Sequence, residues 1–119
     1  MSETGLLLVE WWGRVLIVRL VDEIRLARMR EAERAVSTAV RGAGGFVIDL
    51  SGTDTDGGIL FGTLANPCLE ALAAGHTVAI CHAPEKLTEM FQVLCLPTPV
   101  RFCASAAEAV TTFATAGVA

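Results

Sequence analysis

The sequence lacks several features that would assign it to a common class of protein. No uncharged run approaches the ~18–20 residues that a helix needs to cross a bilayer, and Met1 to Thr4 include no basic segment of a secretory signal. Lys and Arg number 9 against 13 Asp and Glu, so with a net charge of −4 we expect no nucleic-acid binding. The 4 cysteines form no Cys-x-x-Cys pair, so we expect buried free thiols rather than disulfides. These absences favour a cytoplasmic protein that does not span a membrane.

What is present is a large apolar fraction arranged in alternating segments. Apolar residues make up 53% of the chain, enough for a core. At 119 residues the chain is too short for two domains, so we expect residues 1–119 to form a single domain. The periodicity predicts strands at residues 6–11, 15–20, 46–50, 76–81 and 100–103, and helices at 26–40, 58–74, 84–94 and 105–115. In the first helix, Leu26 and Met29 begin the apolar face that we expect to be buried. This order predicts an α/β fold: a mixed, mostly parallel five-stranded sheet packed with about four helices, with an antiparallel edge from the first hairpin.

Prolines and tryptophans add local expectations. Pro67 lies inside the predicted helix 58–74, so we expect a break or kink near Asn66, or a second helical piece capped by Asn66. A turn is expected at residues 97–99, where two prolines stand. Trp11 and Trp12 adjoin the hairpin turn and point to opposite faces. We expect one of them in the core and the other free to anchor a partner or a dimer edge.

The most informative segment runs from Gly45 to Leu60, where a buried strand ends in an acidic, glycine-rich loop before a helix. Such a loop offers free backbone N–H groups and the positive end of a helix dipole. At the end of the strand, Asp49 is expected to cap the following turn through its backbone. Gly57 and Gly58 fit either a turn that needs positive φ or a binding role, and the two interpretations are compatible.

Several segments, taken in order, resemble the STAS domain. They are FVIDLSG at 46–52, DGGIL at 56–60, AAGHTVAI at 73–80 and VRFCASAAEAV at 100–110. The resemblance covers roughly residues 6–115 and implies a STAS-like (SpoIIAA-like) fold. STAS domains occur in bacterial anti-sigma factor antagonists, stressosome proteins and the cytosolic tails of sulfate-type transporters. The resemblance therefore implies a signalling protein in transcription regulation, without cofactors. Its implied partner is an anti-sigma factor that is also a kinase, or a stressosome-like protein, and a homodimer is possible.

The chain departs from the pattern of the family in the loop that a kinase modifies. The antagonists carry a hydroxyl there, next to an aspartate, but Asp56 is followed by Gly57 and Gly58. In a shifted register Gly58 matches the glycine of the family, and Asp56 takes the hydroxyl position as a permanent stand-in for phosphate. Arg25 stands where the family often has an acid. Phosphorylation at the usual position is therefore not expected. The fallback acceptors are Thr55, Thr53 and Ser51.

Two functional classes stay open at this point. The first is the signalling adaptor, and the second is a ligand-binding or transport-associated module for a lipid or a small anion. An enzyme is not expected because no nucleophile–base pair or carboxylate pair is evident, and His82 has no second close ligand for a metal. The arginines between residues 25 and 34 are expected to form a solvated helix face. The predicted partner-binding residues are Asp56, Gly57, Gly58, Ile59, Leu60, Ile24 and Arg25.

Overall fold

The computed structural model describes residues 6–94 and 100–115. Its elements, in chain order, are β1 (Leu7–Trp12), β2 (Val15–Leu20), the 3₁₀ turn η1 (Leu26–Arg28), α1 (Met29–Val40), β3 (Gly45–Asp49), α2 (Gly57–Ala73), β4 (Thr77–Cys81), α3 (Glu85–Gln92), β5 (Arg101–Cys103) and α4 (Ala106–Thr115). The predicted order of strands and helices is confirmed, with boundaries that differ by a few residues. Cys95 and the turn predicted at residues 97–99 lie outside the described residues.

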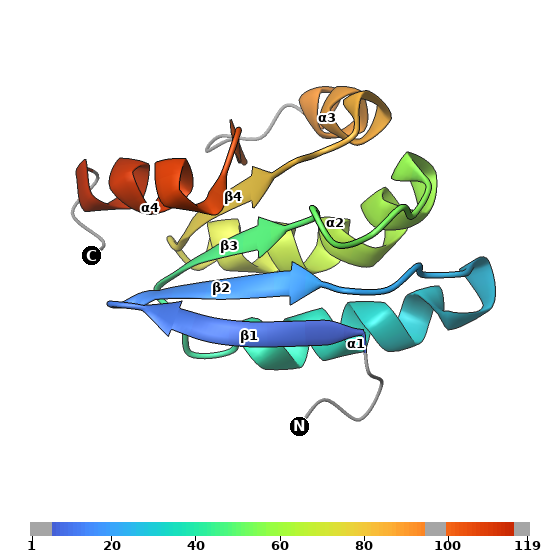
Figure 1. Ribbon diagram of the computed structural model, residues 1–119, viewed down its shortest axis with the longest axis horizontal. Coiled ribbons are helices and arrows are strands. Elements are labelled where there is room, and N and C mark those ends of the chain that lie inside the picture. The colour runs from blue at the N-terminus through green and yellow to red at the C-terminus, as the bar shows by residue number, and fades with distance from the viewer. Residues whose placement is uncertain (1–5, 95–99, 116–119) are drawn as a thin grey trace.

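The five strands form one mixed sheet in the order β1-β2-β3-β4-β5. β1 pairs antiparallel with β2, and the remaining neighbours run parallel. The register aligns apolar residues across the parallel part, where Ile48 of β3 lies between Val18 of β2 and Ile80 of β4. The predicted mixed sheet with an antiparallel edge is confirmed (Figure 1). The arrowheads of β2, β3 and β4 point to one end of the molecule, and the loops that follow them meet there.

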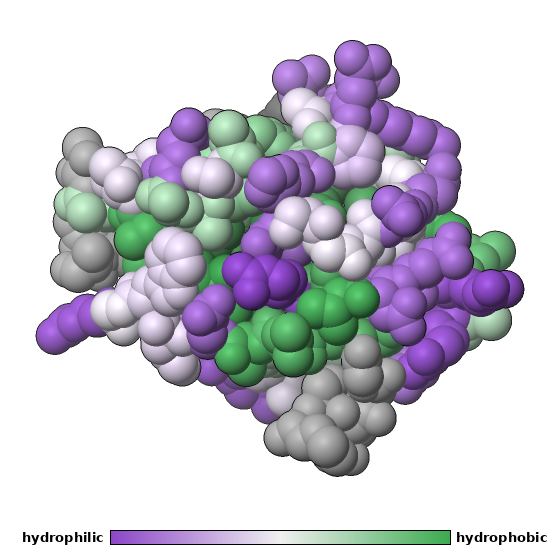
Figure 2. All heavy atoms as spheres, viewed as in Figure 1, coloured by the Kyte–Doolittle hydropathy of each residue, from purple (hydrophilic) through white to green (hydrophobic). Residues whose placement is uncertain are grey.

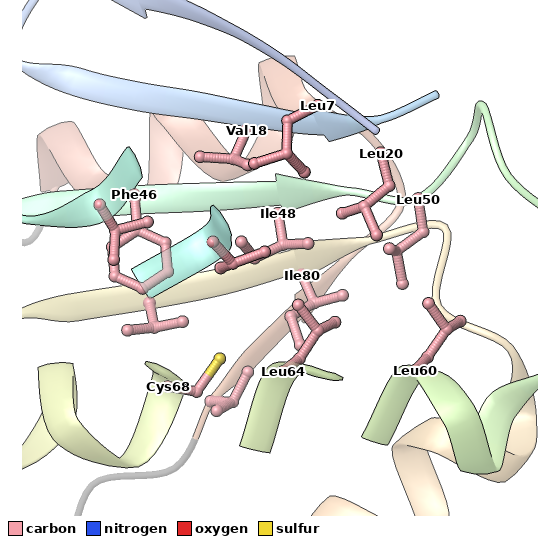
Figure 3. Packing of buried hydrophobic residues seen from close by; sticks show 14 of the residues in the cluster. Leu7, Val18, Leu20, Phe46, Ile48, Leu50, Leu60, Leu64, Cys68 and Ile80 are labelled. Carbon is pink, nitrogen blue, oxygen red and sulfur yellow. The ribbon is translucent and has the colours of Figure 1, made fainter. Parts of the chain in front are cut away.

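Helices cover both faces of the sheet and create two apolar cores. The larger core fills the space between the sheet and α1 with α2, and Figure 3 shows Phe46, Ile48, Leu64 and Cys68 converging there. Each fully buried side chain of this size contributes roughly 1.5–3 kcal/mol relative to exposure. The smaller core lies under α4, where Phe113 is fully buried against β2, β3 and β4. No helix in the described part of the chain is long and apolar enough to cross a membrane.

The break that Pro67 predicts in the second helix does not occur. α2 runs without interruption from Gly57 to Ala73, with Pro67 buried inside it. A proline in a helix interior removes one backbone hydrogen bond and crowds the preceding turn. The same turns bring Leu64, Cys68 and Ala71 into the larger core. Burial of these side chains outweighs the local cost of the proline, so packing overrides the local preference.

Two predictions about apolar residues are wrong. Leu26 was expected on the buried side of the first helix, but η1 buries none of its residues, because a 3₁₀ turn does not continue the angular spacing of α1. One of Trp11 and Trp12 was expected in the core, but both are exposed. β1 is an edge strand, and the contacts of α4 are with β2 to β5. Within residues 6–94 and 100–115, the main contacts of α4 thus stop short of the edge at which Trp12 lies.

Candidate functional site

The candidate site is the end of the sheet where β2, β3 and β4 stop. The loop at residues 21–25 follows β2, the loop at residues 50–56 follows β3, and residues 82–84 connect β4 to α3. Because the carboxyl ends of parallel strands meet at one edge, residues far apart in the sequence come together here. Figure 1 shows the three connections side by side, with the N-termini of α2 and α3 next to them.

Asp49 anchors the start of the β3–α2 loop. Its carboxylate is almost fully buried and accepts hydrogen bonds from the Arg19 Nε, at 2.8 Å, and from the Ser51 backbone N–H, at 2.9 Å. Burial alone would raise the pKa of Asp49, but these hydrogen bonds and the Arg19 charge outweigh it, so the pKa is lowered. The predicted turn-capping role of Asp49 is confirmed. The ion pair with Arg19 joins this turn to β2.

Two threonines tie the β3–α2 loop to the β2–η1 loop. The Ile24 N–H donates to the Thr55 hydroxyl at 2.8 Å, and the Thr53 hydroxyl donates to the Asp22 carbonyl at 2.7 Å. The two hydroxyl oxygens are 2.6 Å apart. Since the single Thr53 proton is used on the carbonyl, the Thr55 hydroxyl must donate to Thr53. The bonds form a ring with the backbone from Asp22 to Ile24, and we call it the threonine ring.

Asp56 caps α2 at the N-terminus. Its Oδ2 accepts from the backbone N–H of Gly58, at 2.8 Å, and of Ile59, at 3.3 Å. The same oxygen is 3.9 Å from Lys86 Nζ, near the start of α3. Both side chains are well exposed, so this ion pair is weak. The carboxylate fills the place at the helix N-terminus where a bound anion would sit.

The two glycines after Asp56 do not serve a turn with positive φ. Among the described glycines, positive φ occurs at three other positions, so this interpretation of Gly57 and Gly58 is wrong. Gly57 is buried, and a Cβ there would lie 3.0 Å from Lys86 Cβ and 3.2 Å from the Leu87 backbone nitrogen. The missing side chain lets α2 approach α3 closely.

Comparisons with solved structures identify this architecture. The unphosphorylated anti-sigma factor antagonist SpoIIAA matches with a TM-score of 0.69 and 17% identity, over 91% of this chain and 97% of that chain. A STAS-domain antagonist protein of Planctomyces limnophilus matches with a TM-score of 0.70 and 17% identity, over 89% and 95% of the two chains. This chain has the STAS fold. An antagonist from Mycobacterium paratuberculosis matches with a TM-score of 0.69 and 21% identity, over 89% and 91%. No protein-family model and no curated protein matches the sequence.

Within the STAS fold, the predicted partner-binding residues separate into a buried and an exposed set. The side chains of Ile24 and Leu60 belong to the larger core, and Gly57 packs against α3. The accessible members are Asp56, Arg25, Gly58 and Ile59. Ile24 contributes to the site through its backbone N–H, which donates a hydrogen bond to Thr55 in the threonine ring. Partner binding by the accessible set stays a prediction.

Sequence reasoning missed two exposed residues at this end. Leu26 is 70% exposed next to Arg25, and Lys86 projects beside Asp56. The helical spacing assigned Leu26 to the core, so its exposure had no signal in the sequence. Lys86 is the one lysine of the chain, but no pattern could place it beside a residue 30 positions away.

Two of the three fallback acceptors, Thr53 and Thr55, are poorly placed for modification. Thr55 is only 4% exposed, and both Thr53 and Thr55 use their hydroxyls in the threonine ring. Ser51 is exposed in the turn that Asp49 caps. His82 is exposed at the end of β4 with a φ of 58°, and no group of three or more His, Cys, Asp or Glu in the described ranges could hold a metal.

The arginines of α1 and its approach form a solvated face, as predicted. Arg28 is ion-paired with Glu31, with Nε and Oε1 2.8 Å apart, and Arg30 is ion-paired with Glu33. These pairs join residues three positions apart on one helix surface. Two of the four arginines between residues 25 and 34 are thus paired with acids of α1.

Proposed function

We propose that this protein is a non-catalytic, cytoplasmic STAS-domain regulator of the anti-sigma factor antagonist type. It binds a partner protein, an anti-sigma kinase or a stressosome-like protein, through the end of the sheet described above. The docking surface consists of Arg25, Leu26, Asp56, Gly58, Ile59 and Lys86. Its exposed leucine and flanking charges suit a protein interface, in which a few anchors are surrounded by polar groups.

The observation that carries this proposal is the preorganisation of the docking surface. The threonine ring fixes the loop that carries Arg25 and Leu26 to the loop that carries Asp56. Asp56 in turn holds the first turn of α2. A surface that is rigid before binding loses less conformational entropy on association, which favours a docking role.

The same contacts argue against control by phosphorylation. Thr53 and Thr55 would have to leave the threonine ring before a kinase could reach either hydroxyl, and Thr55 is also buried. Asp56 supplies a fixed negative charge at the N-terminus of α2, with about half or more of the charge of a phosphate. We therefore expect the docking surface to act in one constant state.

The ligand-binding alternative has less support at this end. An anion recognised by the N-terminus of α2 would need the N–H groups of Gly58 and Ile59, which the Asp56 carboxylate occupies. An incoming anion would also meet that carboxylate at close range. The contacts thus favour a protein partner over a small anion.

The test is affinity capture from the native cell extract with matched variants of the docking surface. Leu26→Asp places a charge on the exposed anchor and should reduce retention of an anti-sigma-type kinase or stressosome-like protein by at least about tenfold, a loss of roughly 1.4 kcal/mol. Val93→Asp is the control, because Val93 is equally apolar, 77% exposed, and follows α3 away from the docking surface. Equal retention by wild type and Leu26→Asp would exclude the docking surface from binding.

A second assay separates docking from modification. The captured kinase with ATP should add no phosphate to the protein, whereas a mass increase mapped to Thr53, Thr55 or Ser51 would contradict the constant state. Intact mass spectrometry is the readout. Binding without phosphate incorporation is the expected combination.

A further inference from the structure

The edge strand β1 carries a second exposed surface, which is mostly apolar, whereas the docking surface includes several charged side chains. Its exposed apolar side chains are Leu8 (59%), Val9 (54%), Trp11 (58%) and Trp12 (37%). Four large apolar residues exposed within six consecutive positions are unusual for a surface without a partner. Figure 2 shows hydrophobic atoms gathered over β1, with hydrophilic atoms beside them.

These side chains alternate between the two faces of the sheet. Leu8 and Trp12 lie opposite Arg19 and Val15 of β2, on the face that α4 covers farther along the sheet. Val9 and Trp11 lie opposite Val18 and Leu16, on the face of α1 and α2. A membrane surface or a helix laid on one face would cover only half of them. A strand added to the free edge of β1 would place side chains beside both halves.

The strand has few of the devices that protect a free edge, since Glu10 is its one charged residue. β1 contains no proline and no lysine, and it pairs with β2 over six consecutive residues without a bulge. Soluble proteins generally blunt an exposed edge with such features, because its unpaired backbone groups are a template for another strand. The absence of these devices in β1 indicates an edge that is normally paired.

The charges on this edge permit a second copy of the same strand. Glu10 is the single charged residue of β1, and its Oε1 lies 3.4 Å from Arg19 Nη1 of the neighbouring strand. Arg19 also pairs with Asp49, so it offsets part of the Glu10 charge and leaves no more than one net negative charge at this edge. An antiparallel register centred on Val9 pairs Glu10 of one copy with Leu8 of the other, which avoids opposing carboxylates.

We propose that the protein forms a two-fold homodimer by antiparallel pairing of β1 with β1 of a second copy. The pairing joins two five-stranded sheets into one continuous sheet, and the exposed side chains of both copies meet on both faces. β1 lies along the edge of the sheet, whereas the docking surface lies at the ends of β2 to β4. The dimer therefore leaves two docking surfaces open.

Sedimentation equilibrium over a concentration series from about 1 to 100 µM tests the proposal, since this range brackets micromolar dissociation constants. The wild type should approach twice the 12.5 kDa mass of one chain. Val9→Lys places two ammonium groups opposite each other and should raise the dissociation constant at least about tenfold. Trp11→Glu should also raise the dissociation constant of the dimer. Val93→Lys, at an exposed valine outside β1, should leave the dissociation constant unchanged.

Three outcomes would overturn the homodimer. One is a wild type that stays monomeric over the whole series, and another is a Val9→Lys protein that dimerises like the wild type. The third is a monomer that co-sediments with phosphatidylglycerol vesicles through β1, which would assign the edge to a lipid surface. Melting curves of dilute Val9→Lys and Trp11→Glu establish that both variants are folded. The experiment uses no partner protein, so its result is independent of the capture assay.

Discussion

The two exposed regions of this domain are stabilised in opposite ways. The docking surface is held by hydrogen bonds between loops, and the neighbouring side chains of Ile24 and Leu60 are turned into the core. The β1 edge has regular strand geometry, but its apolar side chains face outward and its outer backbone edge has no partner strand in the described residues. The first region is ordered within one chain, and for the second we propose completion by another chain.

The difference shows where a mutation should affect folding and where it should affect association. Removal of a buried hydrogen-bond partner leaves a donor or acceptor unsatisfied in the folded monomer. Replacement of an exposed side chain changes the stability of the monomer very little. Substitutions at the two regions therefore separate by their effect on the free energy of unfolding.

The largest loss of stability is expected for Gly57→Arg at the docking end. The new Cβ would meet Lys86 Cβ at 3.0 Å and the Leu87 backbone nitrogen at 3.2 Å, so α2 and α3 must move apart. We expect the free energy of unfolding to fall by about 2 kcal/mol or more in a urea titration. Gly58→Arg is the control, because its Cβ faces only the ends of the exposed Asp56 and Lys86 side chains. Equal losses for the two variants would contradict the close contact at Gly57.

The next effect tests the threonine ring. Thr55→Val keeps the shape of the side chain but leaves the buried Ile24 N–H without its acceptor. The expected loss is about 1–3 kcal/mol of unfolding free energy, measured by urea titration. Thr88→Val removes a long, 3.5 Å bond to the Pro84 carbonyl and should have little effect. A Thr55→Val protein as stable as the wild type would show that the threonine ring does not contribute to the free energy of unfolding.

Asp49→Asn should lower stability in a pH-dependent way. The pKa of Asp49 is lowered from its ordinary value of 3.8 by the Ser51 N–H and Arg19, against the opposing effect of burial. Its contribution is therefore fully present well above pH 3.8 and is lost as the pH falls through the lower, folded-state value. At pH 7 the variant should lose about 1–3 kcal/mol, and the difference from wild type should shrink near pH 3. Urea titrations at both pH values provide the measurement, and a loss independent of pH would point to packing.

The smallest effect is expected at the β1 edge. Trp11→Ser removes a large but exposed side chain, so the unfolding free energy of dilute, monomeric protein should change by no more than about 0.5 kcal/mol. The melting temperature of concentrated wild type should rise with concentration, and that of the variant should not. A loss above about 2 kcal/mol in dilute protein would place Trp11 in the monomer core instead.

The sheet and its order were predictable from the sequence because buried strands and amphipathic helices have different apolar periods. Both Phe46–Leu50 and its neighbour at 76–81 are apolar runs too short for helices, and α1 shows a helical stripe. The failures have a common cause. The helix break at Pro67 and the burial of Leu26 and of one tryptophan were predicted from local sequence preference. The structure at these positions depends instead on which helix covers which strand.

The position of the candidate site was predictable from the sequence, but the hydrogen bonds that hold its loops together were not. A strand that ends in an acidic, glycine-rich loop located it, and the cap by Asp56 agrees with its residue type. The threonine ring joins residues 31 positions apart, and no periodicity in the sequence reports such a contact. Two threonines flanking Asp54 were the one visible signal.

The threonine ring also makes one amide proton informative. The Ile24 N–H lies in an irregular segment between β2 and η1, where amide protons normally exchange with solvent quickly. Its bond to a buried hydroxyl should slow that exchange to the rate at which the two loops separate. A single backbone resonance can therefore report how often the docking surface opens, whether or not a partner is present.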